Sequence, residues 1–217
     1  MKDFNEKTAT KGVLKSFDSI ENKRVKQLMT SIVNHLHAVV KETEPTFEEW
    51  MKAIEFLTNT GKKSNDKRQE FILFSDVFGV SMLIDTINNR KVNGETESTV
   101  LGPFHAPAPE IKFGENIAKE VNGEKCLVKG SVKDNQGNTI PSALIDVWQS
   151  GPDGLYDVQK ENNIVDLRGK MITNNEGNYF FRTVKPQYYP VPTDGPVGEI
   201  LKLLDRHPYR PAHIHFM

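Results

Sequence analysis

The hydrophobic pattern of this 217-residue chain changes its period near residue 95. Before that point, apolar residues recur at steps of three and four, as in the run from Ile20 to Val40, which indicates an amphipathic helix. After it, short alternating runs are separated by Gly, Asn, Asp and Pro, which is typical of strands. The pattern predicts an α+β fold, with an N-terminal helical domain at 1–95 followed by a mainly antiparallel β-sandwich at 96–217.

Stop and start signals divide the helical part. Pro45 ends the first long helix because proline cannot continue a helix interior. Thr46, with Glu49 three residues later, has the spacing of a capping box and begins a second helix. Two shorter helices follow, starting near Asp66 and at Val80. Short helices depend on packing, so we expect these two to lie against other elements.

Four strands are predicted in the second part, at residues 126–132, 144–149, 170–173 and 179–184. The last two flank the turn sequence Asn174–Gly177 and are expected to pair as a hairpin. Several short strands with turns between them favour a sandwich or a barrel.

The C-terminal residues, Arg210–Met217, have the pattern of a further strand. Side chains alternate along a strand, so His213 and His215 should point to one face and Ile214 to the other. Two imidazoles on one face can bind a transition metal. A His-x-His pair is short, however, and ordinary surface or core histidines show it too.

Composition excludes several classes of function. A net charge of −1 gives no electrostatic basis for binding nucleic acid or anionic membranes, and a hydrophobic content of 37% suits a globular core. No apolar stretch approaches the roughly 18 residues that span a bilayer, and the N-terminus lacks the apolar core of a signal peptide. Cys126 is the single cysteine, so no internal disulfide can form, and we expect a cytoplasmic protein.

Tyrosines are the candidate partners of the two histidines. Tyr156 follows an Asp-Gly-Leu turn sequence, and Tyr189 lies in an extended segment flanked by prolines. A phenolate is a hard oxygen donor that suits Fe(III), whereas zinc sites favour Cys, His and carboxylates. The ordinary phenol pKa is about 10, so only a strong Lewis acid would hold the deprotonated form at neutral pH. Each tyrosine alone could equally be a packing residue at a strand end.

Longer motifs around these residues resemble the intradiol ring-cleaving dioxygenases over nearly the whole chain. The matching blocks are Asp146–Gln149, Asp153–Asp157, Leu167–Lys170, Tyr189–Pro196 and Arg206–His215. The resemblance implies an enzyme that takes an aromatic diol and O₂ and inserts both oxygen atoms into the ring. It also implies one Fe(III) per subunit, with a solvent hydroxide and four protein ligands, Tyr156, Tyr189, His213 and His215.

Within the family, the sequence is more similar to the hydroxyquinol branch than to the catechol branch. The product would be maleylacetate or its tautomer 3-hydroxy-cis,cis-muconate; the alternative is catechol cleavage to cis,cis-muconate. Asp76 could accept a hydrogen bond from the third ring hydroxyl, which catechol lacks, or could be a solvated helix residue. The resemblance implies a substrate pocket formed by Leu73, Asp76, Val100, Leu101, Gly102, Pro103, Phe104, Val191, Pro192 and Arg210.

The resemblance also implies catalytic roles and partners. Tyr189 would leave the metal and take up a substrate proton, and Arg210 would stabilise negative charge on the ring, although it could instead belong to a structural ion pair. The family uses its N-terminal helices for homodimerisation, and many members hold a phospholipid there. Alternatively, the apolar stripe of these helices could pack against the sandwich of the same chain.

Family members continue for several strands past the second histidine, whereas this sequence ends two residues after His215. We therefore expect a sequence that is cut short and a sandwich without its last strands. Two other interpretations stay open, a non-catalytic β-sandwich binding module and a zinc hydrolase on a similar fold. A binding module would lack the colour of an iron–phenolate centre. A zinc hydrolase would need a carboxylate base, and the sequence offers no identifiable one.

Overall fold

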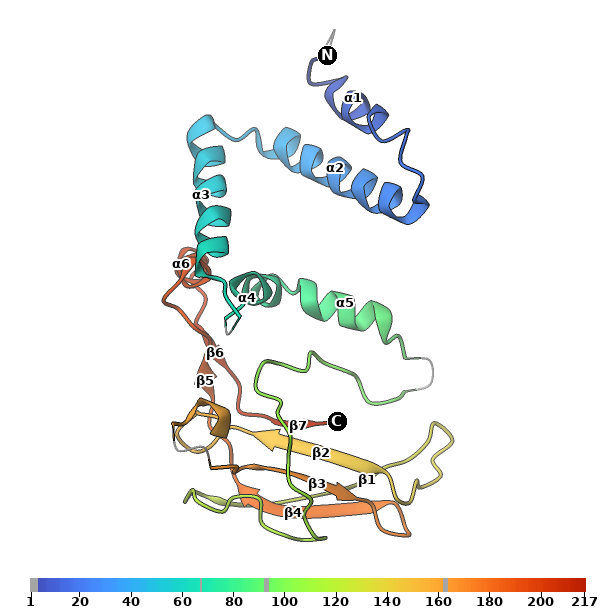
Figure 1. The fold of residues 1–217 in the computed structure, drawn as a ribbon, viewed down its shortest axis with the longest axis vertical. Coiled ribbons are helices and arrows are strands. Elements are labelled where there is room, and N and C mark those ends of the chain that lie inside the picture. Colours follow the sequence, from blue (N-terminus) through green and yellow to red (C-terminus); the bar gives the residue numbers. More distant parts are fainter. Residues whose placement is uncertain (1–3, 67, 92–93, 162–163) are drawn as a thin grey trace. The chain divides into compact units, whose positions relative to one another are not determined.

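The computed structural model describes residues 4–66, 68–91, 94–161 and 164–217 (Figure 1). The chain forms two compact units, Met1–Thr58 and Asn59–Met217. The first contains α1 (Ala9–Lys15), α2 (Lys23–Thr43) and most of α3 (Phe47–Lys63). The division into domains near residue 95 stays a prediction. No helix in the described part of the chain is long and apolar enough to cross a membrane.

Local hydrogen bonds fix the ends of the helices in the first unit. The side-chain oxygen of Asn22 caps α2 by accepting from the N–H groups of Arg24 and Val25. The predicted capping box is present, because Thr46 N donates to Glu49 Oε2 at 2.8 Å and Glu49 N donates to Thr46 Oγ1 at 3.2 Å. Sequence analysis missed α1, which is short and carries a weak apolar pattern.

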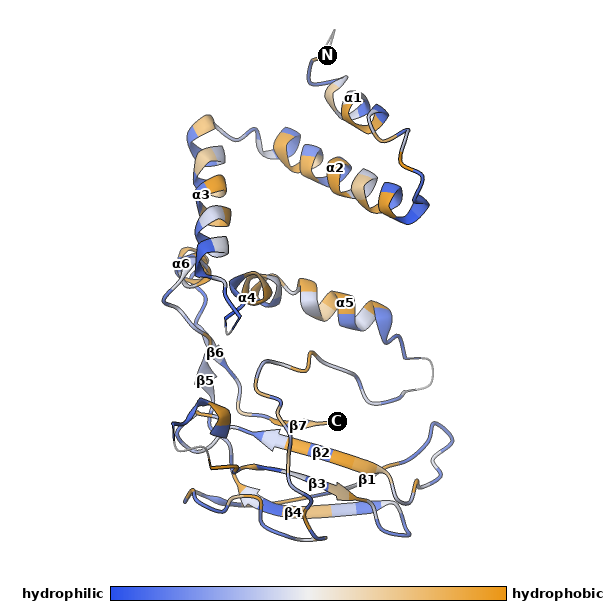
Figure 2. Ribbon diagram, in the orientation of Figure 1, coloured by the Kyte–Doolittle hydropathy of each residue, from blue (hydrophilic) through white to orange (hydrophobic). Residues whose placement is uncertain are grey.

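The apolar stripes of α2 and α3 are exposed. In Figure 2 hydrophobic residues run along both helices. Leu36 of α2 is 60% exposed, and Phe47, the first residue of α3, is 89% exposed. The stripe predicted from the sequence is therefore present, but within the chain it is only partly covered.

The described part of the second unit contains three further helices. α4 spans Glu70–Val77, α5 spans Val80–Asn88, and Gly79 between them has a φ of +71°, which a residue without Cβ adopts most readily. α6 spans Pro196–Leu203 and was not predicted from the sequence. Its signal was Pro196 itself, since proline at the first position is a common start of a helix.

The strands form two facing sheets and one small ribbon. β1 (Lys125–Ser131) pairs with β4 (Asn178–Val184), and the strands of the described residues pair with one another in antiparallel fashion. In the second sheet β2 (Leu144–Gln149) lies between β3 (Arg168–Ile172) and β7 (Ile214–Phe216). The ribbon joins β5 (Tyr189–Pro190) and β6 (Tyr209–Arg210).

Both sheets contribute to one apolar core. Val147 of β2 and Met171 of β3 pack in the same buried cluster as Phe181 of β4, together with Ile111 and Ile117 from the preceding connection. A core filled from the inner faces of two sheets is the defining feature of a sandwich. The predicted α+β fold with a mainly antiparallel β-sandwich is confirmed.

The predicted hairpin around Asn174–Gly177 is wrong. The turn itself forms, with Gly177 N donating to Asn174 O at 2.9 Å, but β3 pairs with β2 and β4 pairs with β1. Both edges of β3 are occupied, because β2 covers one and Glu110 bridges to Lys170 on the other. The chain therefore crosses from one sheet to the other at this turn.

The continuous strand predicted for Arg210–Met217 is also wrong. Arg210 ends β6, and β7 begins only at Ile214. Pro211 has no N–H to donate to a neighbouring strand, which explains the interruption. His213 lies just before β7, whereas His215 lies within it.

Candidate metal centre and substrate pocket

The two histidines face each other despite the break in the strand. Their Nε2 atoms lie 3.2 Å apart, and His213 Nε2 lies 3.3 Å from the phenolic oxygen of Tyr156. His213 Nδ1 lies 2.6 Å from the carbonyl oxygen of Pro211. Since a carbonyl only accepts, we assign the ring proton of neutral His213 to Nδ1. The Nε2 lone pair of His213 is then directed toward His215 and Tyr156.

His215 is fixed by stacking and kept neutral by burial. Its ring lies parallel to that of Trp148, with centroids 4.6 Å apart and an interplanar angle of 2°. Burial, reinforced by the nearby His213, Arg210 and His105, lowers the pKa of His215 to about 4. Burial also lowers the pKa of His213, with Arg210 acting in the same direction. Both imidazoles are therefore uncharged at neutral pH and have lone pairs to share.

The two tyrosines approach the histidines from the interior. Tyr156 is completely buried, and its ring stacks on Phe104 at a centroid distance of 4.5 Å. The ring of Tyr189 meets it edge-on at 5.5 Å. Burial, followed by the hydrogen bond with Tyr189, raises the pKa of Tyr156. The phenol of Tyr156 is thus neutral unless a strong positive charge lies beside it.

A buried arginine fixes the segment behind Tyr156. Arg168 of β3 forms an ion pair with Asp157, the next residue after Tyr156, and its Nε donates to Asp157 Oδ2 at 2.7 Å. The same guanidinium donates to the carbonyl oxygens of Ala106 at 3.1 Å and Phe104 at 3.3 Å. Arg168 thereby holds Tyr156 and Phe104 in one arrangement. Sequence reasoning gave Arg168 no role, because its partners are distant in the chain.

Arg210 and Tyr189 are paired across the small ribbon. They are direct cross-strand partners in β5 and β6. Arg210 Nη1 donates to the phenolic oxygen of Tyr189 at 2.9 Å. The described residues give Arg210 no carboxylate partner, and its role toward a substrate ring stays a prediction.

The four predicted ligand residues thus lie together, although they come from separate segments. Tyr156 precedes a 3₁₀ turn at Asp157–Gln159, and Tyr189 begins β5. His213 and His215 lie at β7. The described ranges contain no group of three or more His, Cys, Asp or Glu side chains that could hold a metal ion, so the proposed centre depends on the two tyrosines as well.

A cavity of about 290 Å³ opens beside Tyr189 and Arg210. Most of the predicted pocket residues line it: Leu73, Asp76, Val100, Gly102, Pro103, Phe104, Val191 and Arg210. The described lining does not include Leu101, which is 49% exposed, or Pro192. Sequence reasoning missed Val77, Met82, Thr99, Leu201, Arg206, His207, Pro208 and Tyr209.

Gly102 brings the backbone close to the histidines. It has a φ of +77°, and a Cβ built there would lie 3.8 Å from Cε1 of His215. The left-handed conformation lets the pocket wall turn at this point, beside the candidate metal centre.

Family models match both parts of the chain. The model described as catechol dioxygenase N terminus matches residues 22–96, and the model described as dioxygenase matches residues 102–217. Hydroxyquinol 1,2-dioxygenase of a Rhizobium species is 50% identical over 217 residues, which cover 99% of this chain and 74% of that protein. 6-Chlorohydroxyquinol 1,2-dioxygenase of Cupriavidus pinatubonensis is 45% identical, over 100% of this chain and 79% of that protein.

A solved structure agrees with these sequence matches. Hydroxyquinol 1,2-dioxygenase from Pseudomonas putida has a TM-score of 0.95 and 46% identity, and the match covers 98% of this chain and 75% of that one. The fold, the family models and the relatives all agree with the resemblance found in the motifs. This chain belongs to the intradiol ring-cleaving dioxygenases.

Proposed function

We propose that this protein cleaves the ring of hydroxyquinol between its adjacent hydroxyl groups. The proposed cofactor is one Fe(III) per subunit, held by Tyr156, Tyr189, His213 and His215. The observation that carries the proposal is the convergence of donors on His213, whose neutral Nε2 lies 3.2 Å from Nε2 of His215 and 3.3 Å from the buried phenol oxygen of Tyr156. Relatives named for hydroxyquinol and 6-chlorohydroxyquinol, at 45–50% identity, support the substrate.

The donor set fits Fe(III). His213 already has its Nδ1 proton engaged with Pro211, which leaves Nε2 free to bind. Burial raises the pKa of Tyr156, so a strongly Lewis-acidic ion is needed to replace the phenol proton. Phenolate oxygen with imidazole nitrogen suits ferric iron better than zinc. When bound, the ion would supply Lewis-acid activation of the diol toward O₂.

Tyr189 and Arg210 handle the proton and the charge. Tyr189 lies at the boundary between the metal centre and the cavity, where its oxygen, in the phenolate form that the proposed ligand set requires, could take a proton from a substrate hydroxyl. The hydrogen bond from Arg210 keeps that oxygen in a fixed position. Arg210 also lines the cavity, so its guanidinium can face negative charge that develops on the ring.

The cavity wall supports a substrate with a third hydroxyl. A volume of about 290 Å³ suits a single aromatic ring, and Leu73, Val77 and Met82 offer apolar contacts to its faces. Asp76 is the one carboxylate among the described residues that line the cavity. We propose that the carboxylate of Asp76 accepts a hydrogen bond from the third ring hydroxyl. Catechol, which has no third hydroxyl, cannot make this contact.

We further propose that two copies associate through the N-terminal helices, with a phospholipid bound there. The exposed apolar residues of α2 and α3 support this arrangement, since stripes of that kind commonly mark association surfaces. Light scattering of the purified protein would show a dimer if the proposal holds. A monomer at micromolar concentration would contradict it.

Oxygen uptake and metal analysis test the proposed function together. The iron-loaded protein should consume O₂ with both diols, and kcat/KM for hydroxyquinol should exceed that for catechol. Metal analysis should give one iron per chain. Stoichiometric zinc without iron, or no oxygen uptake with either diol, would show the proposal to be wrong.

A further inference from the structure

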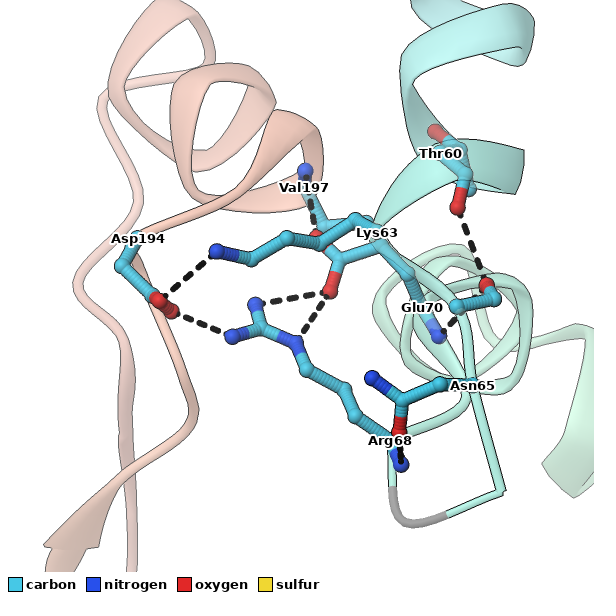
Figure 3. Close-up of polar contacts among 8 residues, drawn as sticks. Thr60, Lys63, Asn65, Arg68, Glu70, Asp194 and Val197 are labelled. Atoms are coloured by element: carbon cyan, nitrogen blue, oxygen red, sulfur yellow. Dashed lines mark hydrogen bonds and ion pairs between the residues drawn. The ribbon is translucent and has the colours of Figure 1, made fainter.

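A charged network lies at the start of α4, and its residues are not among the described residues that line the cavity. The carboxylate of Glu70 has 0% exposure, although charged groups are rarely buried without compensation (Figure 3). It accepts from Arg68 Nε at 2.9 Å and from the backbone N–H of Val197 at 3.2 Å. Val197 lies in the first turn of α6, so Glu70 of one helix caps another that is distant in the sequence.

The network extends to a third segment. Arg68 Nη1 donates to Asp194 Oδ1 at 2.6 Å, and the other oxygen of Asp194 accepts from Lys63 Nζ at 2.9 Å. Lys63 is the last residue of α3, and Asp194 is five residues beyond Tyr189. The end of α3, the start of α4 and the chain leading into α6 are thus joined at one place, as Figure 3 shows.

Helical spacing links this network to the cavity. Leu73 and Val77 follow Glu70 by three and seven residues, so they share its face of α4. Leu201 follows Val197 by four residues and shares its face of α6. Leu73, Val77 and Leu201 all line the cavity, and α4 and α6 pack against each other. The two helices that the Glu70–Val197 hydrogen bond joins therefore both contribute residues to the pocket wall.

The far end of α4 is held as well. Arg206, which follows α6, donates from Nη1 to the carbonyl oxygen of Val77 at 2.8 Å. The first residue of α4 is consequently bonded to the first turn of α6, and its last residue to the chain that follows α6. Asp76 lies within this doubly held helix and lines the same cavity as Arg210.

We propose that Glu70 and Arg68 are positioning residues that fix α4 against α6 and thereby set the preference for a ring with a third hydroxyl. The inference rests on the proposed function, because it acts through Asp76. Buried charge pairs are weak contributors to stability compared with apolar packing, but they can favour one arrangement of the segments they join. Here that arrangement determines how far Asp76 stands from a bound ring.

Gly195 offers a direct way to disturb the network. A Cβ at this position would lie 2.5 Å from Glu70 Oε1 and 2.9 Å from Arg68 Nη2. The φ of −142° and ψ of −178° at Gly195 are extended values that any residue adopts. Gly195→Ala therefore pushes the carboxylate away from α6 without backbone strain and without changing any charge.

The test compares Glu70→Gln, Gly195→Ala and Asp76→Asn with the wild-type holoenzyme. Steady-state kcat and KM are measured for hydroxyquinol and for catechol, and Tm is recorded for each protein. We expect Glu70→Gln and Gly195→Ala to lower the ratio of kcat/KM values between the two substrates by about tenfold, chiefly through KM for hydroxyquinol. Glu124→Gln, at an exposed ion pair with Lys185, is the control and should keep the wild-type ratio.

Double variants show whether Glu70 acts through Asp76. Glu70→Gln combined with Asp76→Asn should lower the ratio no further than Asp76→Asn alone. The positioning role is overturned if Asp76→Asn loses the wild-type ratio of kcat/KM values but Gly195→Ala and a folded Glu70→Gln protein keep it. A lower Tm in these two variants would not change that conclusion. If wild type cleaves neither diol, the proposed function fails instead, and the two failures are thereby distinguished.

Discussion

Arg210 donates a hydrogen bond of 2.9 Å to the phenolic oxygen of Tyr189, its direct partner across the β5–β6 ribbon. Because both residues line the cavity, this bond links the candidate metal centre to the substrate pocket. A two-stranded ribbon fixes the pair through the backbone. The position of the guanidinium is therefore set before a substrate enters.

Arg210→Gln should reduce kcat for hydroxyquinol by about 100-fold, because it removes a charge aimed at the reacting ring. The steady-state rate of oxygen uptake at saturating hydroxyquinol gives kcat for each protein. Arg24→Gln, at an exposed position of α2, is the matched control and should leave kcat unchanged. A variant with normal kcat and only a higher KM would mean that Arg210 merely binds the substrate.

Tyr156→Phe should weaken iron binding by at least about tenfold, because it deletes a donor oxygen and leaves the buried ring in place. The stacking on Phe104 is retained, so folding should be little affected. Iron per chain after dialysis against a chelator is the measurement. Tyr188→Phe, at an exposed neighbouring tyrosine, should keep its iron, and equal retention in both variants would argue against Tyr156 as a ligand.

Arg168→Met should lower the free energy of unfolding by about 3–5 kcal/mol, because it leaves the buried Asp157 carboxylate without its partner. Urea unfolding followed by circular dichroism gives this value. Lys185→Met removes one side of the exposed pair with Glu124 and should cost less than about 1 kcal/mol. Equal losses in the two variants would mean that the buried pair has no special importance.

Asp194 should contribute a pH-dependent part of the stability. Its hydrogen bonds with Lys63 and then with Arg68 lower its pKa to about 2, whereas an unfolded Asp titrates near 3.9. The folded state therefore favours the carboxylate, so the contribution is present above about pH 4 and is lost as the pH falls through about 2.

Urea unfolding of wild type and Asp194→Asn at several pH values measures that contribution. The wild type should be more stable at pH 6, and the difference should shrink between pH 4 and pH 2. A difference that stays constant over this range would contradict the linkage between Asp194 and its two cationic partners.

Local signals predicted much of this fold. The capping box at Thr46 and Glu49, the proline that ends α2 and the alternation in β1 depend on neighbouring residues alone. The ligand candidates were found because family motifs surround them. The predictions that were wrong concerned contacts between residues distant in the sequence. The turn at Asn174–Gly177 looks like a hairpin until the neighbours of β3 are known.

The network around Glu70 could not be predicted for the same reason. In the sequence, Glu70 is an ordinary acidic residue in the first turn of a helix, where it would usually be exposed. Its burial follows from α6, which lies over 120 residues further along the chain. Arg168 is similar, since its partners Asp157, Ala106 and Phe104 come from two separate segments.

The visible absorption spectrum of the protein loaded with Fe(III) tests the central claim most directly. If Tyr156 and Tyr189 provide phenolate ligands beside His213 and His215, a charge-transfer band should give the protein a wine-red colour. The band should weaken or shift in Tyr156→Phe. A colourless protein that nevertheless contains one iron per chain would contradict the proposed metal centre.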